Sequence, residues 1–258
     1  MRIKTSTLLI LMGTVLAVLR SASPAFAQGS LTPPAGAPAP TMRTLMQTEP
    51  RIPIDVAPFT ITQPGSYYLT TNLVTASSGI TISTNSVTLD LMGFTVSRAG
   101  QSSGFGISVV GGVSAPCRAV VVRNGSVRNF QTGVRLVNAQ NCRLEGLASF
   151  DNSSTGLLLD GDVSSACIGN VLEGCAVFDN GSYGIRLSAY QGSCDGNSIA
   201  RCTVTGNGAH PESAHYGGIY FYGNTGSCKG NRVEDCLLRN NSGNGIFLYY
   251  VSQNIIEN

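Results

Sequence analysis

One seven-residue pattern occurs three times in the chain, as GNVLEGC at 169–175, GNSIARC at 196–202 and GNRVEDC at 230–236. The three copies align without gaps, and each has an asparagine five residues after its final cysteine, at Asn180, Asn207 and Asn241. Self-similarity of this kind is typical of repeat architectures. The pattern therefore predicts a stack of similar units.

A second repeat extends over most of the chain. Seven glycines, at spacings of 27, 27, 23, 28, 34 and 27 residues, are each followed by alternating apolar positions. The alternation indicates a strand with one buried face, and the glycine indicates a tight corner before it. Units of this length bury their apolar faces only by stacking into a continuous core. The glycines are Gly79, Gly106, Gly133, Gly156, Gly184, Gly218 and Gly245.

These repeats resemble the right-handed parallel β-helix proteins of the pectin-lyase-like superfamily, whose coils are short strands joined by turns that carry Asn and Gly. The resemblance covers about residues 57–258, and residues 59–69 look like the start of exported bacterial members. It implies an all-β solenoid of about seven coils. The calcium-holding Asp cluster of pectate lyases and the Asn-Thr-Asp, Gly-His-Gly and Arg-Ile-Lys signatures of polygalacturonases are not found, which weighs against catalysis.

The residues before the repeats predict export. Basic residues, an apolar stretch and Ala25-Phe26-Ala27 are typical of a signal peptide at 1–27, and a Pro/Ala-rich leader follows at 28–56. The β-helix domain is predicted at 57–258, in the periplasm, on the cell surface or outside the cell. Cleavage leaves 13 basic and 14 acidic residues, so no basic surface for nucleic acid and no membrane span are expected.

The repeated polar residues have a structural interpretation. We expect the asparagines to stack as hydrogen-bonded ladders, and Asp151 and Asp179 to be turn residues and not a catalytic pair. The eight cysteines all lie between residues 117 and 236, and three pairs share the C-x7-C spacing. Buried thiols in two core columns are favoured over disulfides. No cofactor or metal site is predicted, because neither histidine lies near a cysteine pair with ligand spacing.

Function has to be carried by outward-facing residues. The second and fourth residues after each glycine should point outward from one sheet. In the last coils they form an aromatic patch with two charged neighbours, which we predict to bind a ligand such as a polysaccharide. The predicted ligand-binding residues are Asp160, Arg186, Tyr220, Tyr222, Phe247 and Tyr249.

The longest repeat contains an extra loop at 208–216, beside this patch, with both histidines of the chain. Its His210, Glu212 and His215 are the candidates for acid–base chemistry if the protein is an enzyme. Three functions remain open: a noncatalytic module that binds polysaccharide or another extracellular partner, a polysaccharide lyase or glycoside hydrolase, and a structural or adhesive rod. The chain stops at the start of a further repeat, which predicts an open last coil that associates or continues into further coils.

Overall fold

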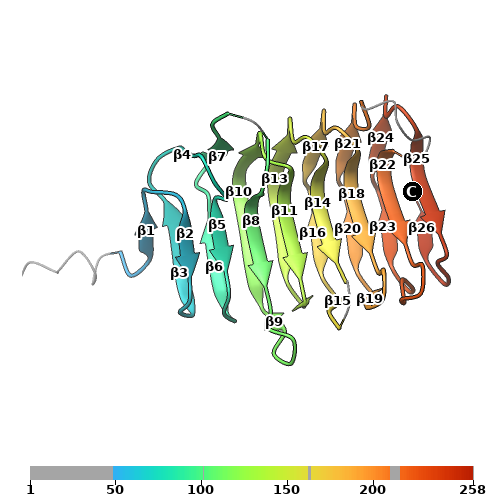
Figure 1. Cartoon of the computed structure of the whole chain (residues 1–258), viewed down its shortest axis with the longest axis horizontal. Coiled ribbons are helices and arrows are strands. Elements are labelled where there is room, and N and C mark those ends of the chain that lie inside the picture. Colours follow the sequence, from blue (N-terminus) through green and yellow to red (C-terminus); the bar gives the residue numbers. More distant parts are fainter. Residues whose placement is uncertain (1–48, 101, 162–163, 210–215, 258) are drawn as a thin grey trace, which may run out of the picture. The chain divides into compact units, whose positions relative to one another are not determined.

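The computed structural model describes residues 49–100, 102–161, 164–209 and 216–257. All regular secondary structure in these residues is β-strand, and every pairing between the strands is parallel, which confirms the predicted parallel β-helix (Figure 1). The predicted signal peptide and most of the predicted leader lie outside the described residues. No helix in the described part of the chain is long and apolar enough to cross a membrane.

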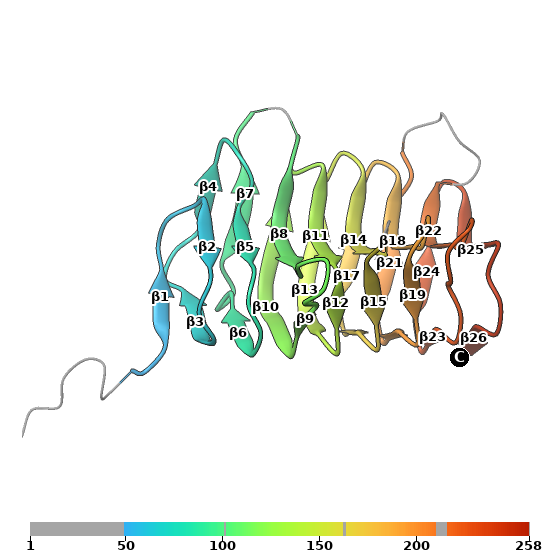
Figure 2. The ribbon, with the colours of Figure 1, turned by 60° about the horizontal axis from the view of Figure 1, so that its bottom comes forward.

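Three sheets extend along the stacked coils (Figure 2). The first sheet contains β1 (Ile52–Ile54), β3 (Gly65–Leu69), β4 (Leu73–Thr75), β6 (Val87–Asp90), β7 (Thr95–Arg98), β10 (Val120–Arg128), β13 (Arg143–Phe150), β16 (Val171–Glu173), β17 (Ala176–Phe178), β20 (Ser198–Ala200), β21 (Thr203–Thr205), β23 (Arg232–Glu234), β24 (Leu237–Arg239) and β26 (Ile255–Glu257). The second sheet contains β2 (Phe59–Ile61), β5 (Ile80–Ile82), β8 (Phe105–Val110), β11 (Thr132–Val137), β14 (Thr155–Asp160), β18 (Tyr183–Ser188), β22 (Gly217–Tyr222) and β25 (Asn244–Tyr249). The third sheet contains β9 (Cys117–Arg118), β12 (Ala139–Gln140), β15 (Ala166–Ile168) and β19 (Ser193–Asp195).

The stack begins earlier than the repeat glycines indicate. Strand β2 adds one member to the second sheet before the first of the seven glycine-led strands. Strand β1 pairs in parallel with β3, so Ile52–Ile54 of the predicted leader belong to the first sheet. Both short strands were missed because no repeat glycine precedes them.

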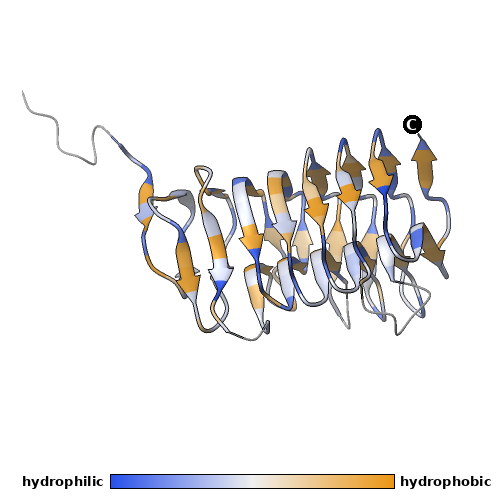
Figure 3. Ribbon diagram, turned by 90° about the horizontal axis from the view of Figure 1, so that it is seen from above, coloured by the Kyte–Doolittle hydropathy of each residue, from blue (hydrophilic) through white to orange (hydrophobic). Residues whose placement is uncertain are grey.

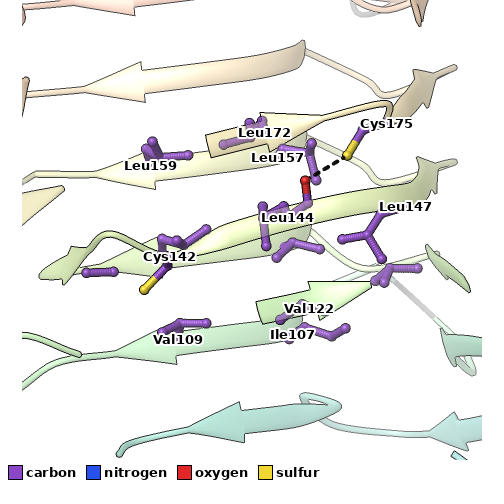
Figure 4. Packing of buried hydrophobic residues seen from close by; sticks show 14 of the residues in the cluster. Ile107, Val109, Val122, Cys142, Leu144, Leu147, Leu157, Leu159, Leu172 and Cys175 are labelled. Atoms are coloured by element: carbon purple, nitrogen blue, oxygen red, sulfur yellow. Dashed lines mark hydrogen bonds between the residues drawn. The ribbon is translucent and has the colours of Figure 1, made fainter. Parts of the chain in front are cut away.

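The core is a set of apolar columns that run through the coils. In the second sheet, Ile107 is in register with Val134 and Val134 with Leu157, and all three are fully buried. Figure 4 shows Ile107 and Leu157 of the second sheet together with Leu144 of the first sheet, in the space between the two sheets. Along the chain, hydrophobic residues are found mainly in the strands, and many of the turns are hydrophilic (Figure 3).

Six of the seven repeat glycines, all but Gly245, are required by close packing and not by a corner conformation. None of the seven has a positive φ, and most lie within a strand of the second sheet. A Cβ on Gly156 would lie 2.7 Å from the carbonyl oxygen of Gly184 and would also overlap Val177 of the first sheet. This corrects the expected tight corner: the two sheets approach too closely here for any side chain.

Two asparagine ladders confirm the structural interpretation of the repeated asparagines. One contains Asn152, Asn180, Asn207 and Asn241. Asn207 donates from its backbone nitrogen and its Nδ2 to Asn241 Oδ1, both at 3.0 Å, and the same pattern joins Asn180 to Asn207. The other ladder contains Asn170, Asn197, Asn231 and Asn254.

The two predicted cysteine columns are present in the core. Cys167 is in register with Cys194. All eight cysteines are free thiols, seven are buried and Cys236 is partly buried. Cys142 lies outside both columns, because it occupies the position next to Asn170 at the end of an asparagine ladder and its backbone nitrogen donates to Asn170 Oδ1 at 2.9 Å.

The two repeated aspartates lie in turns, and the last coil is more exposed than the others. Asp151 and Asp179 both have a φ of 53°, the left-handed conformation of a turn residue, as predicted. In the last coil, Leu248 and Ile256 continue the inward-facing columns but are 41% and 48% exposed. These two apolar side chains are therefore less covered than their in-register neighbours Phe221 and Val233 in the preceding coil.

Candidate functional site

The outward columns of the second sheet have the register that the sequence predicts. One column joins Arg186 of β18 to Tyr220 of β22 and Phe247 of β25. The other joins Asp160 of β14 to Ser188, Tyr222 and Tyr249. Six predicted ligand-binding residues therefore lie on one face of four consecutive strands. Those residues are Asp160, Arg186, Tyr220, Tyr222, Phe247 and Tyr249.

The aromatic rings stack on one another. Tyr222 and Tyr249 have ring centroids 5.7 Å apart and planes within 5°, and Tyr220 and Phe247 are 5.4 Å apart and within 18°. Coplanar rings would overlap at these distances, so the ring faces point along the stack of coils. Tyr183 stacks on the other side of Tyr220, which is only 7% exposed. The rings therefore do not form a flat platform, and Tyr220 supports the patch from within.

Arg186 lies among three of these rings. Its Cζ is 5.3 Å from the ring centroid of Tyr183 and 5.8 Å from those of Tyr220 and Tyr222. Its Nε is buried and has no hydrogen-bond partner among the residues that the structure describes. Among the described residues Arg186 forms no ion pair, and its Nη2 donates to Ser188 Oγ at 3.4 Å. A guanidinium held in this way keeps donors available at its outer end.

Asp160 is paired with a different arginine. Both Nε and Nη2 of Arg135 donate to Asp160 Oδ2, at 3.1 and 2.6 Å. Arg135 and Arg186 occupy equivalent diagonal positions on either side of Asp160, one coil away in each direction. The pairing with Arg135 fixes the carboxylate and leaves Arg186 as the cation of the site that has no carboxylate beside it in the described structure.

These residues enclose a pocket of about 360 Å³ between β14 and β22. Its floor is Ser188, the smallest residue of the column that contains Asp160, Tyr222 and Tyr249. The pocket is lined by Leu158, Asp160, Arg186, Ser188, Tyr190 and Tyr222. It combines an aromatic ring, a guanidinium, a hydroxyl and a carboxylate in one small concave site.

The phenols beside Arg186 are held in their neutral form. Burial raises the pKa of Tyr220 to about 12, and burial also raises the pKa of Tyr183. A hydrogen bond with Tyr250 raises the pKa of Tyr249. At neutral pH these three hydroxyl groups are therefore hydrogen-bond donors and acceptors and not bases.

Part of this site was predicted from the sequence. Asp160, Arg186 and Tyr222 line the pocket, whereas Phe247 and Tyr249 extend the ring stacks away from it. The predicted acid–base candidates His210, Glu212 and His215 lie outside the described residues. Four contributors were missed. Leu158 and Ser188 stood in the outward columns but carry no strong chemical signal, and Tyr183 and Tyr190 lie just outside the columns.

The described residues do not contain a cluster of three or more His, Cys, Asp and Glu side chains able to hold a metal ion.

Comparisons with known proteins agree with the architecture. A crystal structure of an alginate lyase from Paenibacillus sp. str. FPU-7 is similar, with a TM-score of 0.52 and 15% sequence identity over 80% of this chain and 76% of that chain. At this identity the likeness concerns the fold. No curated protein matches the sequence. The family model "Right handed beta helix region" matches residues 66–228, more than half of the chain, and the protein therefore belongs to the right-handed β-helix family.

Proposed function

We propose that this protein binds a polysaccharide noncatalytically, through the second-sheet face around Arg186 and Tyr222. The observation that carries the proposal is the pocket itself, which brings together an arginine that forms no ion pair among the described residues and the half-buried ring of Tyr222. Sugar rings have an apolar face and a rim of hydroxyl groups, so they need both kinds of contact. The structural similarity to an alginate lyase supports a polysaccharide over other classes of ligand.

Each lining group has a defined part in this binding. The ring of Tyr222 packs against the apolar face of a sugar, and the outer nitrogens of Arg186 donate to hydroxyl or carboxylate oxygens. Asp160 accepts from sugar hydroxyls while Arg135 holds it in place. Because Arg135 is bound to Asp160, one positive charge remains in the pocket, and carboxylated glycans are attracted over neutral ones.

A polysaccharide lyase or hydrolase is the second candidate, favoured by the same structural similarity. The raised pKa values of Tyr183 and Tyr220 weigh against it, because a tyrosine that acts as a base has to lose its proton near neutral pH. If the protein is an enzyme, His215, which the sequence offers as an acid–base candidate, is the first residue to test.

The test is retention on a panel of immobilised uncharged, carboxylated and sulfated polysaccharides, with released reducing and unsaturated ends measured in the same samples. We expect retention without product. Tyr222→Ala and Arg186→Gln should each weaken it about tenfold. The matched controls are Tyr68→Ala, whose ring lies 4.6 Å from Arg51, and Arg118→Gln, which is exposed and bonded to Gln140.

Three outcomes are informative. Loss of retention in the site variants alone supports the proposal. Retention of no polysaccharide by the wild-type protein contradicts binding and favours a structural or adhesive rod. Release of reducing or unsaturated ends contradicts noncatalytic binding and favours an enzyme. The next variant to test is then His215→Ala.

We further propose that the protein is exported, on the basis of the predicted signal peptide at 1–27. Fractionation of cells that express the full chain tests this. We expect a product that begins at Gln28 outside the cytoplasm, detected by N-terminal sequencing, whereas an intact Met1 terminus in the cytoplasm contradicts it.

A further inference from the structure

The pocket is a gap in a column of large side chains. In the outward column of the second sheet, Ser188 stands between Asp160 on one side and Tyr222 on the other, and Tyr249 follows Tyr222. Neighbouring strands lie about 4.8 Å apart, so the gap spans about two strand spacings. One large residue at position 188 would fill it.

The shape of the gap sets how a sugar enters. Tyr222 stacks on Tyr249 with one face, and Arg186 Cζ lies 5.8 Å from its ring centroid, so the Tyr222 ring and the Arg186 guanidinium together border the space above Ser188. A sugar that packs on the ring beside this guanidinium stands parallel to the ring, with its plane across the stack of coils and its edge toward Ser188. Equatorial glycosidic bonds of a pyranose leave from the rim of the ring, close to that plane. A bound chain with such linkages would therefore extend along the strand direction or outward to solvent.

Large side chains line the pocket at both ends of the strand direction. Arg186 lies two residues before Ser188 and Tyr190 follows two residues after it, and both line the pocket. Leu158 and Asp160 close the side opposite Tyr222. Large side chains therefore stand on four sides of Ser188, and a polymer that passed through the pocket along the strand direction would have to cross Arg186 and Tyr190.

We infer that the pocket is a slot for a single sugar unit at a chain end or side branch, with Ser188 as the residue that determines specificity. This inference rests on the proposed polysaccharide binding. The glycan enters edge first, packs on Tyr222 and contacts Arg186 and Asp160 with its rim, while the rest of the chain leaves toward solvent.

The first test is Ser188→Tyr, which extends the Tyr222–Tyr249 ring stack by one member and fills the slot. We expect at least about a tenfold loss of affinity for every polysaccharide that the wild-type protein retains, with thermal unfolding unchanged or raised. Ser188→Leu fills the slot with a different shape in case the tyrosine variant does not fold. Thr81→Tyr is the matched control, at an outward position on distant β5.

The second test uses the number of chain ends. A retained polysaccharide competes in solution either intact or after partial depolymerisation, at equal mass. A slot for chain ends predicts stronger competition after depolymerisation, in proportion to the ends created, and one affinity for short and long oligosaccharides. Competition that weakens as the chains shorten would overturn the inference, because it indicates contacts along several units.

The outcomes separate the two proposals. If the wild-type protein is retained by no member of the panel, the proposed function fails and the slot fails with it. If retention needs Arg186 and Tyr222 but survives both substitutions of Ser188, the proposed function stands and the slot is wrong.

Discussion

The asparagine ladders and the slot lie in the same coils, but they differ in how well their buried polar atoms are hydrogen-bonded. Inside, the amide of Asn207 is fully used: Nδ2 donates to three oxygens, and Oδ1 accepts from the backbone and side chain of Asn180. On the outward face of the second sheet, the Nε of Arg186 is buried and has no hydrogen-bond partner among the described residues. An unsatisfied donor costs free energy, about 1–3 kcal/mol, so the interior is built for stability and the slot is not.

The largest expected effect is on the ladder. Asn207→Ala removes the hydrogen bonds of one rung and leaves buried groups of Asn180 and Val177 without partners, so unfolding should become easier by about 3–5 kcal/mol. Urea unfolding measures this. Asn85→Ala is the control, because exposed Asn85 accepts one bond from Arg118 and should cost about 1 kcal/mol. Equal costs would show that ladder position is unimportant.

The next effect concerns the glycines that let the two sheets approach. Gly156→Ala should cost about 1–3 kcal/mol, because its Cβ meets the Gly184 carbonyl and Val177. Gly245→Ala should be nearly neutral, because its Cβ finds its nearest atom 3.9 Å away. Differential scanning calorimetry of the pair checks this. A similar cost for both variants would point to backbone conformation instead of packing.

The phenol beneath the slot gives a smaller, pH-dependent effect. The pKa of Tyr220 is raised from 10.0 to about 12 in the folded protein, so folding favours the neutral phenol. Its contribution is complete below pH 10 and decreases as the pH rises toward 12, by about 1 kcal/mol at pH 11. Unfolding free energies measured from pH 9 to 11 should fall less steeply in Tyr220→Phe. Parallel pH profiles would contradict this assignment.

The smallest expected effect on stability is at Arg186. Arg186→Met removes the unsatisfied Nε together with the contacts to three tyrosine rings, and these terms oppose each other. The unfolding free energy should stay within about 1 kcal/mol of wild type, whereas polysaccharide retention should be lost. A strongly destabilised variant would place Arg186 with the ladders as a structural residue.

The inside of the coils could be predicted residue by residue. Asn180, Asn207 and Asn241 recur at one offset, and identical residues in stacked coils meet identical neighbours, so their pairing follows from the repeat. The repeat glycines were found in the same way, although the reason for them was not. A glycine that avoids a clash and one that forms a corner look alike in sequence, and only φ and the surrounding atoms distinguish them.

The site could be predicted only in part. The outward columns placed Asp160, Arg186 and Tyr222 on one face, because side-chain direction alternates along a strand. They did not reveal that Asp160 pairs with Arg135, since Arg135 and Arg186 lie on equivalent diagonals. They also did not reveal that Tyr220 is buried, because that depends on how its ring packs against its neighbours.

The sequence by itself therefore determined the stacked parallel coils, the asparagine ladders, the thiol columns and the face that carries the aromatic residues. These follow from period and alternation, which the backbone converts directly into position. Only the tertiary structure decided which arginine Asp160 binds, that the Tyr220 ring is buried and that Ser188 forms a slot between larger neighbours. Those properties depend on side-chain conformations across three coils, and each outward residue there has different neighbours, so no repeat in the sequence records them.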